Sequence, residues 1–140
     1  MKAFTFRLET LLHLREMSKE RAIKEYAQAI SKREKLELDL SKAVEMLELL
    51  NAEIHDRRAK GFSGFEQDGF NQSILRSKEI IIDLNSKVAD SKNIESAKRN
   101  LYLLADSNCK SLLKLKEKKK VEHLKSEEKK EESELEDIIG

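Results

Sequence analysis

The sequence Gly61-Phe-Ser-Gly-Phe-Glu-Gln-Asp-Gly69 interrupts a chain of 140 residues that contains no proline and has its only other glycine at position 140. Glycine adopts positive φ at little cost, so three glycines this close together favour a turn. Ser63 and Glu66 have the spacing of a helix-capping box, and Asp68 is an alternative N-cap, so a helix begins near residues 64 to 70. We predict one turn at about residues 61 to 69, between helices at about residues 5 to 60 and 70 to 137.

The arm before the turn has apolar residues at heptad spacing. Counting alternately by four and three residues from Leu8, eleven of fourteen positions are apolar. The positions are Leu8, Leu12, Arg15, Lys19, Ala22, Tyr26, Ala29, Arg33, Leu36, Leu40, Ala43, Leu47, Leu50 and Ile54. A stripe of this kind, sustained without glycine up to Lys60, is typical of a helix in a coiled coil.

The arm after the turn starts a second heptad frame, which then loses its apolar character. Its first members are Phe70, Ile74, Ser77, Ile81, Leu84 and Val88. The next positions are Ser91, Glu95 and Lys98, whereas a frame one residue earlier holds Ile94, Ala97, Leu101 and Leu104. We therefore predict a register slip in this helix. Residues 127 to 137 hold seven acids and two lysines, and we expect this end to fray or to need a partner.

Two helices with one apolar stripe each can bury both stripes by folding back on each other. If the turn centres near residue 65, facing residues have numbers that sum to about 130. Tyr26 then faces Leu104. Leu36 faces Ile94 in the same way. The predicted fold is all-α and forms one domain, residues 1 to 140, in which two long helices make an antiparallel coiled-coil hairpin.

Composition and charge limit the classes of function. Hydrophobic residues and charged residues each make up 39% of the chain, which suits a thin seam better than a thick core. Lys and Arg (28) nearly balance Asp and Glu (27), so we expect no binding to nucleic acid and no attraction to an anionic membrane. Because no apolar run approaches the length of a membrane span, we expect no membrane insertion and a cytoplasmic location.

Residues that could bind metal or carry out catalysis do not form a recognisable site. His13, His55, His123 and Cys109 show no zinc-binding spacing, and we expect neither a metal nor a cofactor. The glycines of the turn lack the pattern of a phosphate-binding loop. A two-helix hairpin offers no enclosed pocket that could tune a catalytic carboxylate, so we expect no enzymatic activity. The function is then expected to lie in contacts with other proteins.

Several large apolar residues fall outside the seam, and a two-helix coiled coil cannot bury all of them. They gather at the two ends of the predicted hairpin, as Phe4, Phe6, Leu11 and Leu14 at one end and Phe62, Phe65, Ile80 and Ile82 at the other. We expect the first four to be exposed in the free chain. Exposed apolar residues either bind a partner protein or pack in a contact between copies of the chain.

The chain opens with Phe4-Thr-Phe-Arg-Leu8-Glu-Thr-Leu-Leu12-His-Leu-Arg15-Glu16, and its last residues include Glu134-Leu-Glu-Asp-Ile138. These two stretches resemble the opening and the acidic ending of the FliJ family of bacterial flagellar type III export. Length and the two-helix pattern agree with this resemblance over essentially the whole chain.

The resemblance implies a flagellar export component, cytoplasmic and peripheral to the inner membrane, whose hairpin is similar to the γ stalk of rotary ATP synthases. Its paired termini are expected to enter the hexamer of the flagellar export ATPase. The residues implied at this end are Phe4, Phe6, Arg7, Leu8, Leu11, Leu12, Leu14, Arg15, Leu135 and Ile138.

The opposite end is expected to contact the cytoplasmic domain of the export-gate protein, and the family also handles export chaperones. The residues implied at the gate end are Leu47, Leu50, Ile54, Phe70, Ile74, Ile80 and Ile82. The first three replace aromatic residues expected late in the first helix. Two alternatives stay open: the equivalent stalk of a virulence-type secretion system, and an unrelated homo-oligomeric coiled-coil scaffold.

Overall fold

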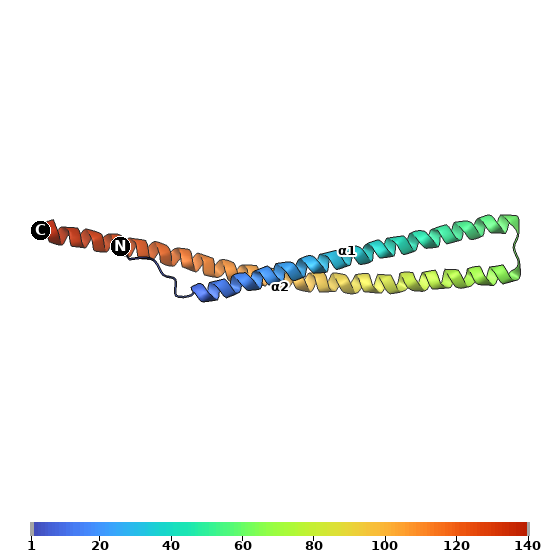
Figure 1. Ribbon diagram of the computed structural model, residues 1–140, viewed down its shortest axis with the longest axis horizontal. Helices are drawn as coiled ribbons and strands as arrows, with labels where there is room; N and C mark the ends of the chain where they lie inside the picture. Colours follow the sequence, from blue (N-terminus) through green and yellow to red (C-terminus); the bar gives the residue numbers. More distant parts are fainter. Residues whose placement is uncertain (1, 140) are drawn as a thin grey trace. The chain divides into compact units, whose positions relative to one another are not determined.

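The chain folds into two long helices. A computed structural model describes residues 2–139, in which α1 spans Glu9–Lys60 and α2 spans Gly64–Ile139 (Figure 1). No strand is found within those residues. Contacts divide the chain into a terminal unit, Met1–Lys24 with Arg99–Gly140, and a turn unit, Glu25–Lys98. In each unit a segment of α1 packs antiparallel against a segment of α2, so the predicted all-α antiparallel hairpin is confirmed.

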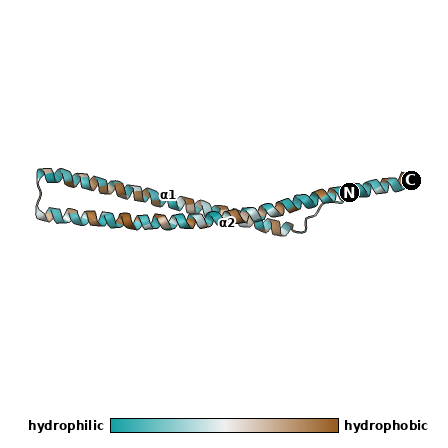
Figure 2. Cartoon of the chain, turned by 180° about the vertical axis from the view of Figure 1, so that it is seen from behind, coloured by the Kyte–Doolittle hydropathy of each residue, from teal (hydrophilic) through white to brown (hydrophobic). Residues whose placement is uncertain are grey.

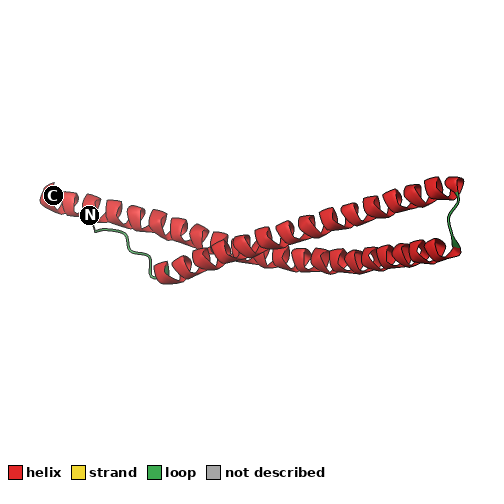
Figure 3. Cartoon of the chain, turned by 45° about the vertical axis from the view of Figure 1, so that its right-hand side comes forward, coloured by secondary structure: helices red, strands yellow, loops and turns green. Residues whose placement is uncertain are grey.

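The turn is shorter than predicted, because α2 begins at Gly64 and only residues 61–63 are non-helical (Figure 3). Gly61 has a φ of 85° and donates its amide to the carbonyl of Arg58 at 3.2 Å, which ends α1. The hydroxyl oxygen of Ser63 accepts a hydrogen bond from the backbone amide of Glu66 at 3.2 Å. This N-cap starts α2 ahead of Gly69, which is therefore helical.

Helix α1 begins at Glu9 and not at about residue 5, because the residues before it take another role. Residues 2–8, here called the strap, run beside α2 as the thin trace in Figure 1. The amide of Glu9 bonds to the carbonyl of Phe6 at 3.1 Å. The side chain of Phe6 is buried with Leu12, Cys109 and Leu112, so burial of this ring competes successfully with extension of the helix.

The seam predicted for α1 is the buried face of that helix. Every one of its positions from Leu12 to Ile54 is buried or half-buried, and only Leu8 is exposed. Apolar and polar residues alternate along both helices in Figure 2, as expected for a narrow seam that leaves most of each helix in water. The heptad spacing thus identified this face correctly.

The register slip predicted for α2 is wrong. The frame that starts at Phe70 continues without interruption, so Ser91 is buried while Glu95 and Lys98 are half-buried. The residues assigned to the earlier frame, Ile94, Ala97, Leu101 and Leu104, are exposed.

Partners across the hairpin explain how polar residues occupy the seam. Arg33, itself a seam residue of α1, forms an ion pair with Glu95. Lys98 pairs with Glu25 at 3.3 Å. The hydroxyl of Ser91 donates to the carbonyl of Val88 at 2.8 Å within its own helix. Because each polar group has a partner, the helix keeps one frame and leaves the alternative apolar set outside.

The predicted pairing is also shifted by several residues. Lys19 lies 2.9 Å from Asp106, and Glu25 lies 3.3 Å from Lys98. Tyr26 therefore lies level with a part of α2 several residues before Leu104. The shift is smaller nearer the turn, where Arg33 pairs with Glu95 and Glu37 with Lys92, each within two residues of the predicted alignment.

The ion pair between Arg33 and Glu95 provides a test of the continuous frame. Either single change, Arg33→Glu or Glu95→Arg, is expected to lower the midpoint temperature (Tm) of thermal unfolding, because two like charges then meet in the seam. The double variant restores opposite charges and should recover most of the lost Tm. Circular dichroism at 222 nm measures the transition.

Ile94→Ser is the matched control, since the earlier frame would bury Ile94 whereas the structure exposes it. We expect this change to alter the free energy of unfolding by less than about 0.5 kcal/mol. A large loss of Tm in Ile94→Ser, together with no change of Tm in Glu95→Arg, would contradict the continuous frame and favour the register slip.

Candidate protein-binding surfaces

The terminal unit is built around one buried cluster, formed by Phe6, Leu12, Cys109 and Leu112. Leu12 and Cys109 are each only 2% exposed, so their side chains are fully packed. Phe4 and Leu115 pack against this cluster from the strap and from α2. The cluster therefore holds the first turns of α1 and the strap onto α2.

The strap has further contacts with α2 beyond the cluster. The carbonyl oxygen of Lys2 accepts a hydrogen bond from Nε2 of His123 at 2.9 Å. The ring of Phe4 lies 5.7 Å from the His123 ring, measured between centroids. These contacts extend the antiparallel pairing past the start of α1, and they give His123 a structural role.

The predicted ATPase-end residues divide into a buried set and an exposed set. Phe6 and Leu12 are buried, and Phe4 and Arg15 are half-buried. The expectation that Phe4 and Phe6 are exposed in the free chain is therefore wrong, because both rings pack on the terminal cluster. The exposed members of this set are Arg7, Leu8, Leu11, Leu14, Leu135 and Ile138.

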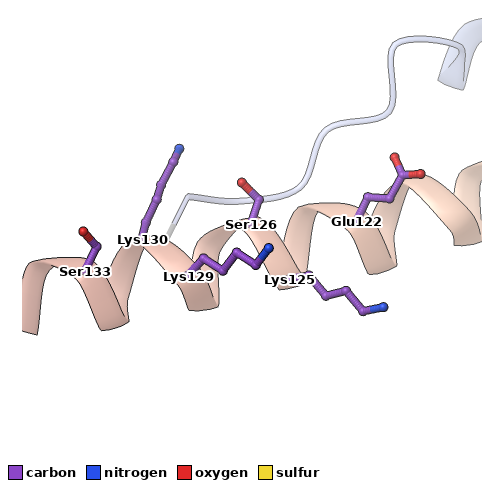
Figure 4. Close-up of a pocket in the computed structure, with 6 residues that line it drawn as sticks. All are labelled: Glu122, Lys125, Ser126, Lys129, Lys130 and Ser133. Atoms are coloured by element: carbon purple, nitrogen blue, oxygen red, sulfur yellow. The ribbon is translucent and has the colours of Figure 1, made fainter.

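Helix α2 continues past the strap as a single helix, and its last part has few contacts. Leu135, Ile138 and Ile139 are exposed there. Glu127 is the exception, since it is buried and lies 3.8 Å from Lys130. Figure 4 shows a shallow, polar hollow along this helix beside the strap. Its lining side chains are Glu122, Lys125, Ser126, Lys129, Lys130 and Ser133.

Ion pairs of the terminal unit lie along one side of the hairpin. Asp106 lies 2.9 Å from Lys19 of α1 and 2.8 Å from Lys110 of its own helix. Hydrogen bonds from Lys110 and Lys19 hold the pKa of Asp106 below its usual value, and the bond to Asp106 raises the pKa of Lys19. Glu9 pairs with Lys116 at 3.0 Å on the same side. The two pairs that join α1 to α2, Lys19 with Asp106 and Glu9 with Lys116, fix the alignment of the two segments.

Most of the predicted gate-end residues belong to the seam of the turn unit. Ile54 is buried, whereas Leu47, Leu50, Phe70 and Ile74 are half-buried. The ring of Phe70 contacts that of Phe62 edge-on, with centroids 5.6 Å apart, and the guanidinium of Arg57 lies 5.5 Å from its centroid. These residues hold the turn unit together, so they are not a free surface.

The exposed apolar residues of the turn unit are partly those that the sequence indicated. Ile80 and Ile82 flank the seam residue Ile81 and are exposed, as is Phe65. Met46 and Leu49 are exposed as well and were not among the predicted residues. Both lie outside the heptad frame, and that was the signal that could have identified them.

Residues 2–139 contain neither a metal-binding cluster nor a membrane-spanning helix. No group of three or more His, Cys, Asp or Glu side chains is placed to hold a metal ion. In the same range, neither helix has a window apolar enough to cross a membrane.

Comparison with known proteins gave one match. The family model described as Flagellar FliJ protein matches residues 4–138. No curated protein and no solved structure matches the chain. The match includes both end motifs and the whole of the turn between the helices.

Proposed function

The chain belongs to the FliJ family and is a component of the flagellar protein-export apparatus, and we propose that it acts there as a stalk-like coupler between the export ATPase and the export gate. In this proposal the terminal unit binds the ATPase hexamer, and the turn unit binds the cytoplasmic domain of the gate protein. Export chaperones are further proposed partners. The proposed location is the cytoplasm, at the inner membrane beside the apparatus.

The observation that carries the proposal is a set of exposed leucines at the end of the strap and on the first turns of α1. Leu8, Leu11 and Leu14 are exposed, while Leu12 beside them is buried in the terminal cluster. A packed cluster thus holds the strap and the helix that present these side chains, so they can bind a partner without first being ordered. Rigid apolar side chains of this kind are typical anchors of a protein interface.

The proposed mechanism needs no chemistry from the chain itself. A stiff coiled coil with unlike faces makes different contacts with successive subunits of a ring. If those contacts differ between nucleotide states, binding free energy couples ATP turnover to the state of the gate. The coupling is reciprocal, so gate binding should alter the affinity of the chain for the ATPase.

Binding of the purified chain to each partner tests the proposal. The immobilised chain should retain both the flagellar export ATPase and the gate domain. Replacing Ile80 and Ile82 together by serine is expected to weaken gate binding by about tenfold or more, because two exposed apolar contacts are lost, and to leave ATPase binding unchanged.

The matched control is Leu38→Ser, which changes another exposed leucine of the turn unit. Normal gate binding by the Ile80/Ile82 double variant would remove these residues from the gate surface. If the wild-type chain failed to retain the ATPase, or failed to retain the gate domain, the proposal that it couples the two would be refuted.

A further inference from the structure

One face of the terminal unit is apolar and basic, and we call it the leucine–arginine face. Leu101 and Leu104 of α2 line a shallow groove there together with Arg15, Ser18, Ala105 and Asn108. Across the groove, a nitrogen of the Arg15 guanidinium donates to the carbonyl of Asn108 at 3.1 Å. Leu11 and Leu14 precede Arg15 and Ser18 at helical spacing, so they continue the same face of α1. We define the face as Leu11, Leu14, Arg15, Ser18, Arg21, Leu101 and Leu104.

Acidic residues of the paired helices lie on the other side of the terminal unit. Helical periodicity places Glu9, Glu16 and Glu20 of α1 roughly opposite Leu11 and Leu14. On α2, helical periodicity places Asp106 roughly opposite Leu101 and Leu104. The carboxylate of Asp106 forms ion pairs with Lys19 and Lys110. Arg21 has no ion pair within residues 2–139. The leucine–arginine face therefore combines exposed leucines with basic groups that acids of the same unit do not neutralise.

A segment of complementary character lies farther along α2. Residues 124–139, here called the acidic segment, are helical and include the seven acids counted above. Leu124, Glu128, Glu131 and Leu135 recur at helical spacing and form one stripe. Ile138 extends the stripe and is exposed, as are Leu124 and Leu135. The stripe thus has apolar residues at its two ends and carboxylates between them.

The spacing along the stripe matches that of the face. Leu124 and Leu135 are separated by about 16 Å at 1.5 Å per helical residue. The ion pairs of Lys19 with Asp106 and of Glu9 with Lys116 place Leu11 and Leu14 about ten residues, or roughly 15 Å, along the unit from Leu101 and Leu104. Arg15 lies between these two leucine pairs, where the carboxylates of the stripe would meet it.

We propose that the leucine–arginine face binds the acidic segment of a second copy of this chain. The segment cannot reach the face of its own chain, because α2 is one continuous helix and carries the segment away along its axis. Leu104 and Leu124 are about 30 Å apart along that helix. A third helix laid into the groove covers the exposed leucines and brings carboxylates to Arg15 and Arg21.

Self-association also bears on the proposed function. Leu11, Leu14, Leu135 and Ile138 are proposed ATPase contacts, and association between copies covers all four. If both proposals hold, the ATPase competes with the second copy. The experiment below uses no ATPase, so its result is independent of the coupler proposal.

The test is binding of a fluorescent peptide with the sequence of residues 124–139 to the full chain, followed by fluorescence anisotropy. We expect saturable binding that weakens as salt is raised, because part of the attraction is between exposed charges. The unlabelled peptide should also reduce self-association of the chain in sedimentation velocity. Replacing Leu101 and Leu104 together by serine is expected to weaken peptide binding and self-association by at least about tenfold each.

The matched control is the double change of Leu103 and Leu113 to serine. These leucines are 46% and 44% exposed, against 52% and 59% for Leu101 and Leu104, but they lie off the face on the same helix. A second pair of variants tests the charges: Arg21→Glu should weaken binding of the natural peptide, and a peptide with Glu128→Lys and Glu131→Lys should restore it. Circular dichroism verifies that each variant remains helical.

Three results would overturn the proposal. The first is absence of peptide binding together with a monomeric chain at high concentration. The second is equal binding by the Leu101/Leu104 variant and the Leu103/Leu113 control. The third is binding of the face to phosphatidylglycerol vesicles, abolished in the Leu101/Leu104 variant, with no binding of the peptide, which would assign the face to an anionic lipid surface.

Discussion

Replacing Leu12 by aspartate is expected to unfold the terminal unit. Leu12 is 2% exposed and packs with Phe6, Cys109 and Leu112. The change removes a fully buried leucine side chain, which costs about 2 to 5 kcal/mol, and adds a carboxylate that has no basic partner in the cluster. The sum approaches the whole free energy of unfolding of an ordinary domain, about 5 to 15 kcal/mol.

Hydrogen exchange followed by mass spectrometry measures this effect locally. Amide protons of residues 9–24 and 99–118 should lose their protection in Leu12→Asp, and those of the turn unit provide an internal reference. Leu14→Asp is the control, since Leu14 lies on the same helix two residues away and is 54% exposed. Equal loss of protection in the two variants would mean that the terminal cluster does not hold the unit together.

The fold could be predicted from the sequence because its main determinants are local. Gly61 ends α1 with a positive φ, and Ser63 caps α2 three residues before Glu66. The α1 stripe from Leu12 to Ile54 is regular enough to specify its buried face without knowledge of the partner. Local backbone preferences and the apolar period thus agree, and when they agree the fold can be predicted from the sequence.

The heptad frame of α2 could not be predicted in the same way. Part of its seam is polar, and ion pairs with α1 stabilise these polar seam residues. Glu95 is a seam residue only because Arg33 lies across from it, and Lys98 only because Glu25 does. A rule that counts apolar residues prefers Ile94 and excludes Glu95. The correct frame depends on pairs of residues far apart in the sequence, which periodicity cannot show.

The exposure of the candidate residues could be predicted where it depends on the frame of α1, but not where residues were assigned from a family motif. Leu11 and Leu14 fall outside the α1 stripe and are exposed. Phe6 matches the family motif but is buried, because residues ahead of the helix fold back onto α2. A motif identifies positions that belong together in a family, whereas packing decides which of them a partner can reach.

Because Phe6 is buried, a variant that separates function from fold at the ATPase end must leave it unchanged. A variant that includes Phe6→Ser would damage the buried cluster, and loss of activity would then have two explanations. Leu8, the last residue of the strap, and Leu11 and Leu14 of α1 are all exposed. Replacing these three by serine should leave the helical content and Tm close to those of the wild-type chain, since exposed substitutions alter stability by about 0.5 kcal/mol or less each.

The same triple variant is expected to lose stimulation of the flagellar export ATPase. Each lost apolar contact removes about 1 to 3 kcal/mol of binding free energy, so three together weaken binding by more than about 100-fold. The measurement is the rate of ATP hydrolysis by the purified ATPase as the chain is titrated. A matched triple control changes Met17, Leu103 and Leu113, exposed apolar residues of the terminal unit that lie elsewhere on its surface, to serine. Normal stimulation by the Leu8/Leu11/Leu14 variant would refute the proposed ATPase contact, and a homo-oligomeric scaffold would then explain the exposed leucines better than a stalk.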